Sequence, residues 1–330
     1  MLAYMLRRLI YMGVVVWILS VASYVIIELP PGDYITSYIS QLQASGEVVD
    51  EAEIAALRKR YGLDLPLYLR YFKWIRNILQ GDFGKSFEWN RPVIDLIAER
   101  LPLTAIISLF TLIFTYAVAI PIGIYSAVHQ YSMGDYIFTV FGFIGLAMPN
   151  FLLALVLMFI LFNYFGLNPT GLFSPQYIDA PWSLAKFMDM LKHLPIPVIV
   201  VGTAGTAGLI RVMRGCLLDE LRKNYVVTAR AKGVAERTLL FKYPVRVAIN
   251  PIISTIGWTL PTIVSGAMIT AIVLNLPTTG TLLYGALMSQ DSYVAGSIVL
   301  LVSSLTVIGT FISDILLMWL DPRIRYERSI

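Results

Sequence analysis

Charged residues are scarce in this chain, and their scarcity sets its class. Of the 330 residues only 14% are charged, 57% are hydrophobic, and the mean hydropathy is +0.72. Soluble globular domains carry about 25% charged residues. The composition therefore excludes an ordinary soluble domain and predicts a protein of the membrane class.

Cysteine and histidine are nearly absent as well. The single cysteine, Cys216, excludes an intramolecular disulfide framework and is interpreted as structural. The two histidines, His129 and His193, are far apart in the sequence and predicted on opposite faces of the membrane. This distribution argues against a His-rich metal site.

Charges are also missing from the interior of the apolar runs, with the exception of Asp314; Glu28 stands at the end of the first run. No Ser/Lys, Asp/Asp or His/Glu set lies within the runs, which argues against an intramembrane enzyme. An ion-coupled secondary transporter, the alternative of a different class, would show related halves and polar residues at the midplane. An intramembrane acid can mark a functional site. Asp314, however, is predicted close to the cytoplasmic interface, where a structural role is favoured.

Six apolar runs are each at or near the roughly 20 residues needed to cross a bilayer. We therefore expect an all-α integral membrane protein with six transmembrane helices. The first run could instead be a cleaved signal peptide, but its length exceeds the 7–15 residues typical of a signal h-region. The runs are 9–29, 103–128, 136–165, 194–210, 248–274 and 294–320.

The longest polar segment of the second half of the chain is 211–250. It holds nine Lys/Arg residues against three acids, and apolar runs flank it on both sides. Short loops rich in Lys and Arg stay in the cytoplasm. This rule predicts that the 211–250 segment and both chain termini are cytoplasmic, in a multi-pass protein of the cell membrane.

The other polar region, 31–102, is predicted to be a helical extracytoplasmic insertion. Within it, 47–60 is expected to form a helix with an acidic start and a basic end, an order that complements the helix dipole. A second, amphipathic helix is expected at 68–79. The expected organisation is an N-terminal helix at 1–30, this insertion, a five-helix core at 103–320 and a cytoplasmic tail at 321–330.

The sequence Gly81-Asp-Phe-Gly84-Lys85-Ser86 is similar to the end of a phosphate-binding P-loop. That loop requires an additional glycine five residues before the second one. Leu79 occupies this position, and no strand is predicted before it. The sequence therefore argues against ATP binding by this chain.

Several stretches together resemble one known family. They are Met5–Ile10 with Pro31–Asp33, Tyr61–Tyr68, Gly81–Gly84, Arg91–Val93, Glu99–Pro102, Tyr225–Gly233 with Asn250-Pro251, and Asp321–Tyr326. In this order they resemble the first of the two membrane subunits of peptide-type ABC importers, the binding-protein-dependent permeases of oligopeptide and dipeptide systems. The resemblance covers nearly the whole chain and implies a type I ABC importer permease fold.

The resemblance also implies function and partners. The chain would form half of a translocation pathway in the lipid bilayer, paired with a homologous second permease subunit. Two ABC ATPase subunits and an extracytoplasmic solute-binding protein would complete the importer, and no nucleic acid is involved. ATP and magnesium would bind the ATPase subunits, so this chain would be neither an enzyme nor the carrier of a cofactor.

In the resembled family a short cytoplasmic helix docks on the ATPase. The resemblance assigns this role to Val227, Thr228, Ala229, Arg230, Ala231, Lys232 and Gly233. Ala229 and Gly233, one helical turn apart, would offer a surface without bulk, and Arg230 and Lys232 could pair with acids of the partner. Glycine inside a helix costs about 1 kcal/mol relative to alanine, so Gly233 suggests a bend or a close contact. The alternative is an ordinary solvated basic loop.

Two positions depart from the family pattern. The general coupling motif begins Glu-Ala-Ala, where this chain has Val227, Thr228 and Ala229, so one candidate salt bridge is missing. Ala271 stands where relatives usually carry a glutamate. These departures leave open an oligosaccharide or a metal chelate as the solute in place of a peptide.

Overall fold

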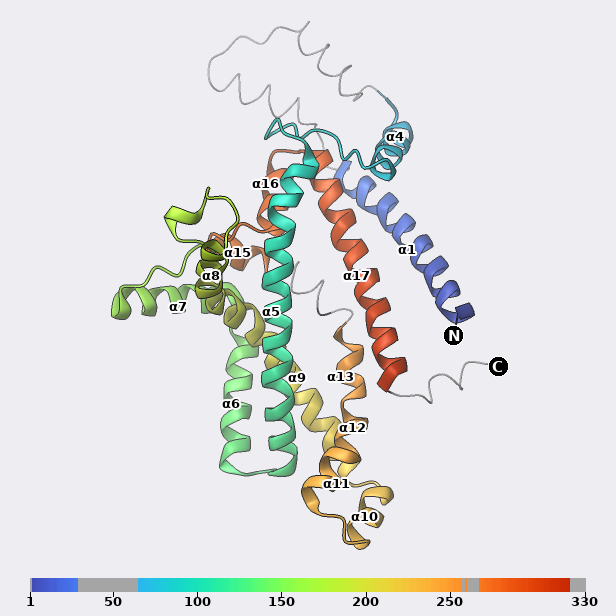
Figure 1. The fold of residues 1–330 in the computed structure, drawn as a ribbon, viewed down its shortest axis with the longest axis vertical. Helices are drawn as coiled ribbons and strands as arrows, with labels where there is room; N and C mark the ends of the chain where they lie inside the picture. The colour runs from blue at the N-terminus through green and yellow to red at the C-terminus, as the bar shows by residue number, and fades with distance from the viewer. Residues whose placement is uncertain (1, 29–64, 257–258, 260–266, 321–330) are drawn as a thin grey trace, which may run out of the picture. The chain divides into compact units, whose positions relative to one another are not determined.

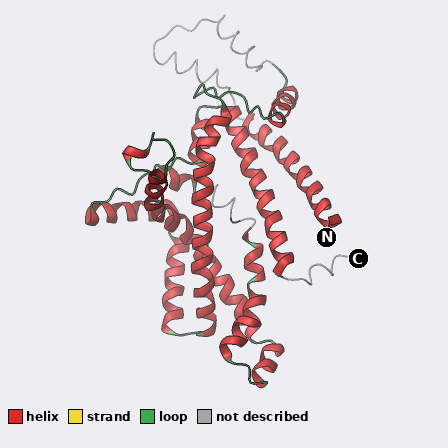
Figure 2. Cartoon of the chain, viewed as in Figure 1, coloured by secondary structure: helices red, strands yellow, loops and turns green. Residues whose placement is uncertain are grey.

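The computed structural model describes residues 2–28, 65–256, 259 and 267–320. All regular elements in these ranges are helices, and the only strand-like feature there is an isolated bridge between Lys85 and Pro92 (Figures 1 and 2). The prediction of an all-α protein is confirmed. The expected helix at 47–60, the motifs at 31–33 and 321–326 and the tail at 321–330 lie outside the described residues.

Four of the described helices are long and apolar enough to cross a membrane. They are α1 (Leu2–Glu28), α5 (Val93–Val128), α9 (Pro195–Leu221) and α17 (Ser292–Leu320). A fifth candidate is the pair of α6 (Met133–Ala147) and α7 (Asn150–Phe165). The predicted span at 248–274 is described only in part, as α13 (Asn250–Ser254) and α15 (Met268–Val273), so the count of six stays a prediction.

The run at 136–165 is not one straight helix. α6 and α7 meet at an angle of 106°. Between them, Met148 has an extended backbone (φ −86°, ψ 121°) and is followed by Pro149. Proline disfavours the helical conformation of the residue before it and has no N–H to donate, so the helix divides at this point.

Helix α9 is longer than the sequence predicts. The expected span ended at residue 210, before Arg211, but the helix continues for eleven more residues to Leu221. Arginine and leucine are good helix formers, so the first basic residue does not end the helix. The prediction that this helix ends at residue 210 is therefore wrong. Arg211, Arg214 and Cys216 are all helical.

The described residues fall into two compact units. The smaller unit comprises the described parts of 2–104 and 277–307, and the larger unit comprises those of 105–276 and 308–320. The smaller unit has a core between α5, α16 (Thr279–Met288) and α17. Its buried side chains are Val93, Leu96, Ile97, Leu282, Ala286, Val294, Ala295 and Ile298.

Within the smaller unit, α4 (Leu67–Leu79) confirms the amphipathic helix expected at 68–79. Its buried residues Tyr71 and Trp74 lie three positions apart, on one helix face, and pack on Tyr24 of α1 with ring centroids 5.6 and 5.1 Å away. An ion pair of 2.8 Å joins Arg70 to Glu28. These contacts hold α4 against the end of α1.

In the larger unit, α9 packs against α5 and against α12 (Pro244–Ala248) and α13. The buried side chains between them are Ala119, Ala127, Leu209, Met213, Leu217, Val245, Ala248 and Ile252. Tyr116 of α5 adds a hydrogen bond of 2.7 Å to Thr255. The helices that follow α9 in the chain therefore return to pack along it.

Side chains of α8 (Leu184–His193) bind the loop that precedes this helix in the larger unit. The loop includes a 3₁₀ turn at Pro175–Tyr177. Asp189 accepts hydrogen bonds of 2.7 Å from both the N–H and the hydroxyl of Ser174. Burial tends to raise the pKa of Asp189, but these bonds outweigh it and hold the pKa below its ordinary value. Lys186 donates to the carbonyls of Ile178 and Ala180.

Candidate functional site

The residues predicted to dock on an ATPase lie in the first of two short helices that follow α9 and together form the α10–α11 turn. They occupy α10 (Asn224–Ala231) and its C-terminal cap, and α11 (Glu236–Lys242) follows. Figure 1 places α10 and α11 at the end of α12 that is farthest from α13. The short helix expected from the sequence is therefore present, while its docking role is untested by the fold alone.

An eight-residue helix such as α10 is too short to be stable alone, so its stability must come from packing. Val226 and Ala229 of α10 and Leu239 of α11 form a buried cluster, with Val234 and Tyr243 packed against it. Val226 and Leu239 are fully buried. Burying such a side chain contributes about 1.5–3 kcal/mol, so this cluster is the packing that joins α10 to α11.

Gly233 ends α10 rather than continuing it. Its φ is +77°, and the helix closes with a hydrogen bond of 3.0 Å from Gly233 N–H to the Arg230 carbonyl and one of 3.3 Å from Val234 N–H to the Ala229 carbonyl. This pattern is a Schellman cap, in which glycine is preferred because it adopts positive φ without strain. The positive φ of this helix cap thus explains why position 233 is a glycine.

This geometry corrects one expectation. Ala229 and Gly233 do not form a smooth exposed surface one turn apart, because Ala229 is only 8% exposed and faces the buried cluster. A Cβ added to Gly233 would have no atom within 4 Å, so no close contact inside the described chain explains the glycine. The sequence analysis interpreted Gly233 as a residue inside a helix, whereas Gly233 marks the end of α10.

Arg230 does not point freely toward a partner. Its guanidinium donates to both carboxylate oxygens of Glu236, at 2.6 and 3.1 Å, and closes the turn between α10 and α11. The Arg230 hydrogen bond lowers the pKa of the Glu236 carboxyl. Both side chains are at least half exposed, so the pair contributes little net stability and chiefly orients the turn.

The other predicted residues form the outer face of α10. The side chains of Val227, Thr228, Ala231 and Lys232 are exposed. Val227 and Ala231 are one turn apart, on the side opposite Ala229, and Val227 is 55% exposed. Of the seven predicted residues, six are therefore exposed, and Ala229 alone belongs to the supporting core.

The turn is tied to the end of α9. The Tyr225 hydroxyl donates to the Glu220 carboxylate at 2.5 Å. Burial and this hydrogen bond raise the pKa of Tyr225. α12 follows α11 directly and packs along α9, so packed side chains join the turn to that helix.

The sequence analysis missed an ion pair beside α9. Asp135 is 3% exposed and accepts two hydrogen bonds from the Arg214 guanidinium, at 3.1 and 2.9 Å. It also accepts from the N–H of Tyr131 at 3.0 Å, while Ser132 caps α6. The spacing Ser132-x-x-Asp135 before an apolar run is a capping pattern and could have revealed the start of α6.

A second missed residue, Asp291, organises the loop at 80–92 in the smaller unit. Asp291 is fully buried and accepts from the Ser86 hydroxyl at 2.6 Å and from the N–H groups of Phe87, Glu88 and Val294 at 2.8, 3.2 and 3.2 Å. Burial raises the pKa of the Asp291 carboxyl, although these four bonds act in the opposite direction. An acid just before an apolar helix is a typical N-cap, which is the signal that was available.

The same loop contains the P-loop-like glycines. Gly84 has φ +80°, and a Cβ there would lie 2.8 Å from the ring of Tyr293. Ser86, which would bind a metal–phosphate complex in a P-loop, is buried and donates to Asp291. The hydroxyl is thus committed to a structural bond.

Two further sequence candidates lie apart from the coupling segment. Ala271, where relatives usually carry a glutamate, is 2% exposed in α15. Asp314 lies in α17 and is partly buried. Neither is brought to α10 or α11 by the contacts described above.

Comparison with known proteins identifies the family. The chain matches the binding-protein-dependent transport system inner membrane component over residues 119–326, and the N-terminal part of such membrane components over 1–109. It is 35% identical to the oligopeptide transport system permease protein AppB of Bacillus subtilis, over 99% of this chain and 100% of that protein.

Other relatives are similar over the same extent. The oligopeptide transport system permease protein OppB of Haemophilus influenzae is 32% identical and the dipeptide transport system permease protein DppB of Alkalihalophilus pseudofirmus 29% identical, each over 99% of this chain and 100% of the relative. The chain belongs to the family of binding-protein-dependent transport system inner membrane components, the membrane-spanning permease subunits of ABC importers.

Proposed function

We propose that this chain forms half of a translocation pathway for peptides and pairs with a homologous second permease subunit. Two ABC ATPase subunits bind ATP and magnesium, and an extracytoplasmic binding protein delivers the solute. The observation that carries the proposal is the full-length similarity to permeases named for oligopeptide and dipeptide transport. Peptides are therefore favoured over oligosaccharides and metal chelates.

Both termini and the segment 211–250 are assigned to the cytoplasm. The basic residues of 211–250 support this orientation, because short basic loops are retained on the cytoplasmic side. The region at 31–102 is then outside, where it is available to a binding protein. ATP chemistry takes place on the partner subunits, and this chain supplies the pathway and its mechanical connection.

We assign docking on the ATPase to the outer face of α10. Val227 and Ala231 present a small apolar surface, and Lys232 adds a positive charge that can pair with an acid of the partner. Arg230 and Gly233 act indirectly, since the first closes the turn with Glu236 and the second caps the helix. Ala229 supports the helix from its buried side.

A bulky side chain on this face tests the assignment. Ala231→Trp places a bulky side chain at an exposed position of α10, whereas Thr238→Trp places the same side chain at an exposed position of α11 and serves as the control. Ala231 is a cleaner target than Gly233, because any other residue at Gly233 strains the turn itself. The assay is uptake of a labelled peptide by the complete reconstituted importer, with ATP hydrolysis measured in parallel.

We expect Ala231→Trp to reduce uptake at least tenfold, because apolar burial at an interface is lost and the ATPase is held away. Thr238→Trp should retain most of the uptake. Equal uptake by the two variants would contradict docking through α10. A wild-type importer that takes up an oligosaccharide or a metal chelate but no peptide would contradict the proposed solute and leave the docking role intact.

A further inference from the structure

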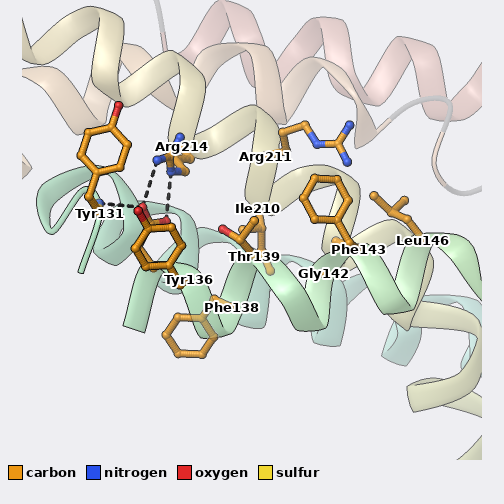
Figure 3. A pocket seen from close by; sticks show the side chains of 12 residues that line it. Tyr131, Tyr136, Phe138, Thr139, Gly142, Phe143, Leu146, Ile210, Arg211 and Arg214 are labelled. Carbon is orange, nitrogen blue, oxygen red and sulfur yellow. Dashed lines mark hydrogen bonds and ion pairs between the residues drawn. The ribbon is translucent and has the colours of Figure 1, made fainter. Parts of the chain in front are cut away.

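A cleft of about 270 Å³ lies between α6 and α9 in the larger unit (Figure 3). Its polar end holds the Asp135–Arg214 pair beside Tyr131, close to the start of α6. Its apolar end is lined by residues of α6 and α9 one to three turns farther along, among them Gly142 and Leu146. Figure 3 shows the Arg211 guanidinium at this apolar end, beside Phe143 and Leu146, so the cleft holds a paired arginine at one end and a second arginine among apolar side chains at the other.

Arg211 gives the cleft a net positive charge. The charged side chains that line it are Asp135, Arg211 and Arg214, and the bidentate bond to Arg214 occupies the only carboxylate. Within the described residues Arg211 forms no ion pair. Its guanidinium lies instead 5.2 Å from the ring centroid of Phe143, as Figure 3 shows. One cation is therefore available to an anionic ligand.

The surroundings of the cleft are those of a membrane surface. The exposed side of α6 carries large apolar side chains, including Ile137, Val140 and Phe141, the last 69% exposed. Tyr131 and Tyr136 are exposed at the polar end, and tyrosines of this kind are typical of the membrane–water interface. A ligand that enters the cleft from this side meets the Asp135–Arg214 pair first, and the Arg211 guanidinium among apolar side chains farther along α6.

We propose that this cleft binds an anionic phospholipid. The phosphate is held by Arg211 beside Phe143, and an acyl chain lies along the exposed apolar side of α6. Basic pockets between transmembrane helices on the cytoplasmic side are suited to such headgroups. An exposed arginine within a span is costly unless it is paired, and a lipid phosphate supplies the partner. The choice of the cytoplasmic leaflet rests on the orientation proposed above.

The test measures binding of spin-labelled phosphatidylglycerol and phosphatidylcholine to the complete importer in nanodiscs. We expect the wild type to immobilise phosphatidylglycerol preferentially. Arg211→Gln should weaken this binding about tenfold, the effect of losing one charge-assisted hydrogen bond. Arg222→Gln is the matched control, because Arg222 is exposed at the end of α9 and outside the cleft, and it should bind as the wild type does.

A second variant leaves every charge in place. Gly142→Leu fills the apolar end, where an added Cβ would only reach ordinary contact with Ala207 at 3.9 Å, and it should also weaken binding. Equal binding by wild type and both cleft variants would overturn the proposal. Release of the label by inorganic phosphate would instead indicate a soluble-anion site, and release by a peptide substrate a solute site; either result overturns the lipid. The measurement uses no ATP or transport, so its failure is distinguishable from failure of the proposed function.

Discussion

The turn at α10–α11 and the loop at 80–92 are stabilised in different ways. The turn encloses three small or medium apolar side chains, and its one ion pair is exposed. The loop is fastened by a fully buried carboxylate that accepts four hydrogen bonds, next to a core of eight buried residues. The loop is therefore held by polar groups that are costly to remove, and the turn by a cap and a minimal core.

This difference fits what each segment offers to its surroundings. In the loop at 80–92 the buried hydroxyl of Ser86 and the N–H groups of Phe87 and Glu88 point inward to Asp291. The turn keeps Val227, Ala231 and Lys232 outside its core. A docking element that gains stability from its partner needs little of its own, whereas a segment that must hold its shape alone requires internal bonds.

The largest expected effect is at the buried carboxylate. Asp291→Ala leaves the hydroxyl of Ser86 and the N–H groups of Phe87 and Glu88 buried without their acceptor, which should cost on the order of 3 kcal/mol of stability. Thermal unfolding of the purified importer and proteolysis within 80–92 measure the loss. Asp82→Ala is the control, because Asp82 accepts a single exposed hydrogen bond; an equal loss from both variants would refute the role of Asp291.

An intermediate effect separates two glycines with nearly the same backbone. Gly84 and Gly233 have φ of +80° and +77°, so alanine at either position costs about 1 kcal/mol of backbone strain. A Cβ at Gly84 would in addition meet Tyr293 at 2.8 Å, while one at Gly233 has open space. Hydrogen exchange in each segment should therefore rise more for Gly84→Ala than for Gly233→Ala. Similar changes would mean that strain alone governs both turns.

The smallest effect concerns the exposed ion pair and depends on pH. Because the folded-state pKa of Glu236 is lowered, its pairing with Arg230 stabilises the turn above the unfolded pKa and is lost as pH falls through the folded value. Glu236→Gln should remove this dependence and change little else at neutral pH. Hydrogen exchange of α10 from about pH 5 to about pH 3 measures it, because the folded pKa lies below the ordinary value of a glutamate; the same pH profile in wild type and variant would exclude the pair as its source.

Periodicity and composition predicted the elements that depend on local sequence. The apolar runs gave α1, α5 and α17, and the amphipathic pattern gave α4, because such helices follow from the spacing of apolar residues. The family resemblance located α10 as a short helix. These features need no knowledge of which distant residues meet.

What the sequence could not supply depends on tertiary contacts. The burial of Ala229 follows from Leu239 folding back on it, and the acceptor role of Asp291 depends on a loop about 200 positions earlier in the chain. Arg230 was predicted to pair with an acid of a partner, but it donates to Glu236 of the same chain. The left-handed backbone of Gly233 was missed because a glycine in a helical pattern reads equally as an interior residue or as a cap.

The break between α6 and α7 has a consequence for hydration. A helix of 15 residues such as α6 is about 22 Å long, shorter than the roughly 30 Å thickness of the hydrocarbon layer. The ends of α6 and α7 that meet at Met148 and Pro149 leave carbonyl and N–H groups without intrahelical partners. Acyl chains cannot satisfy such groups. The polar groups at the break therefore need water or polar groups of protein as partners, and acyl chains cannot replace these.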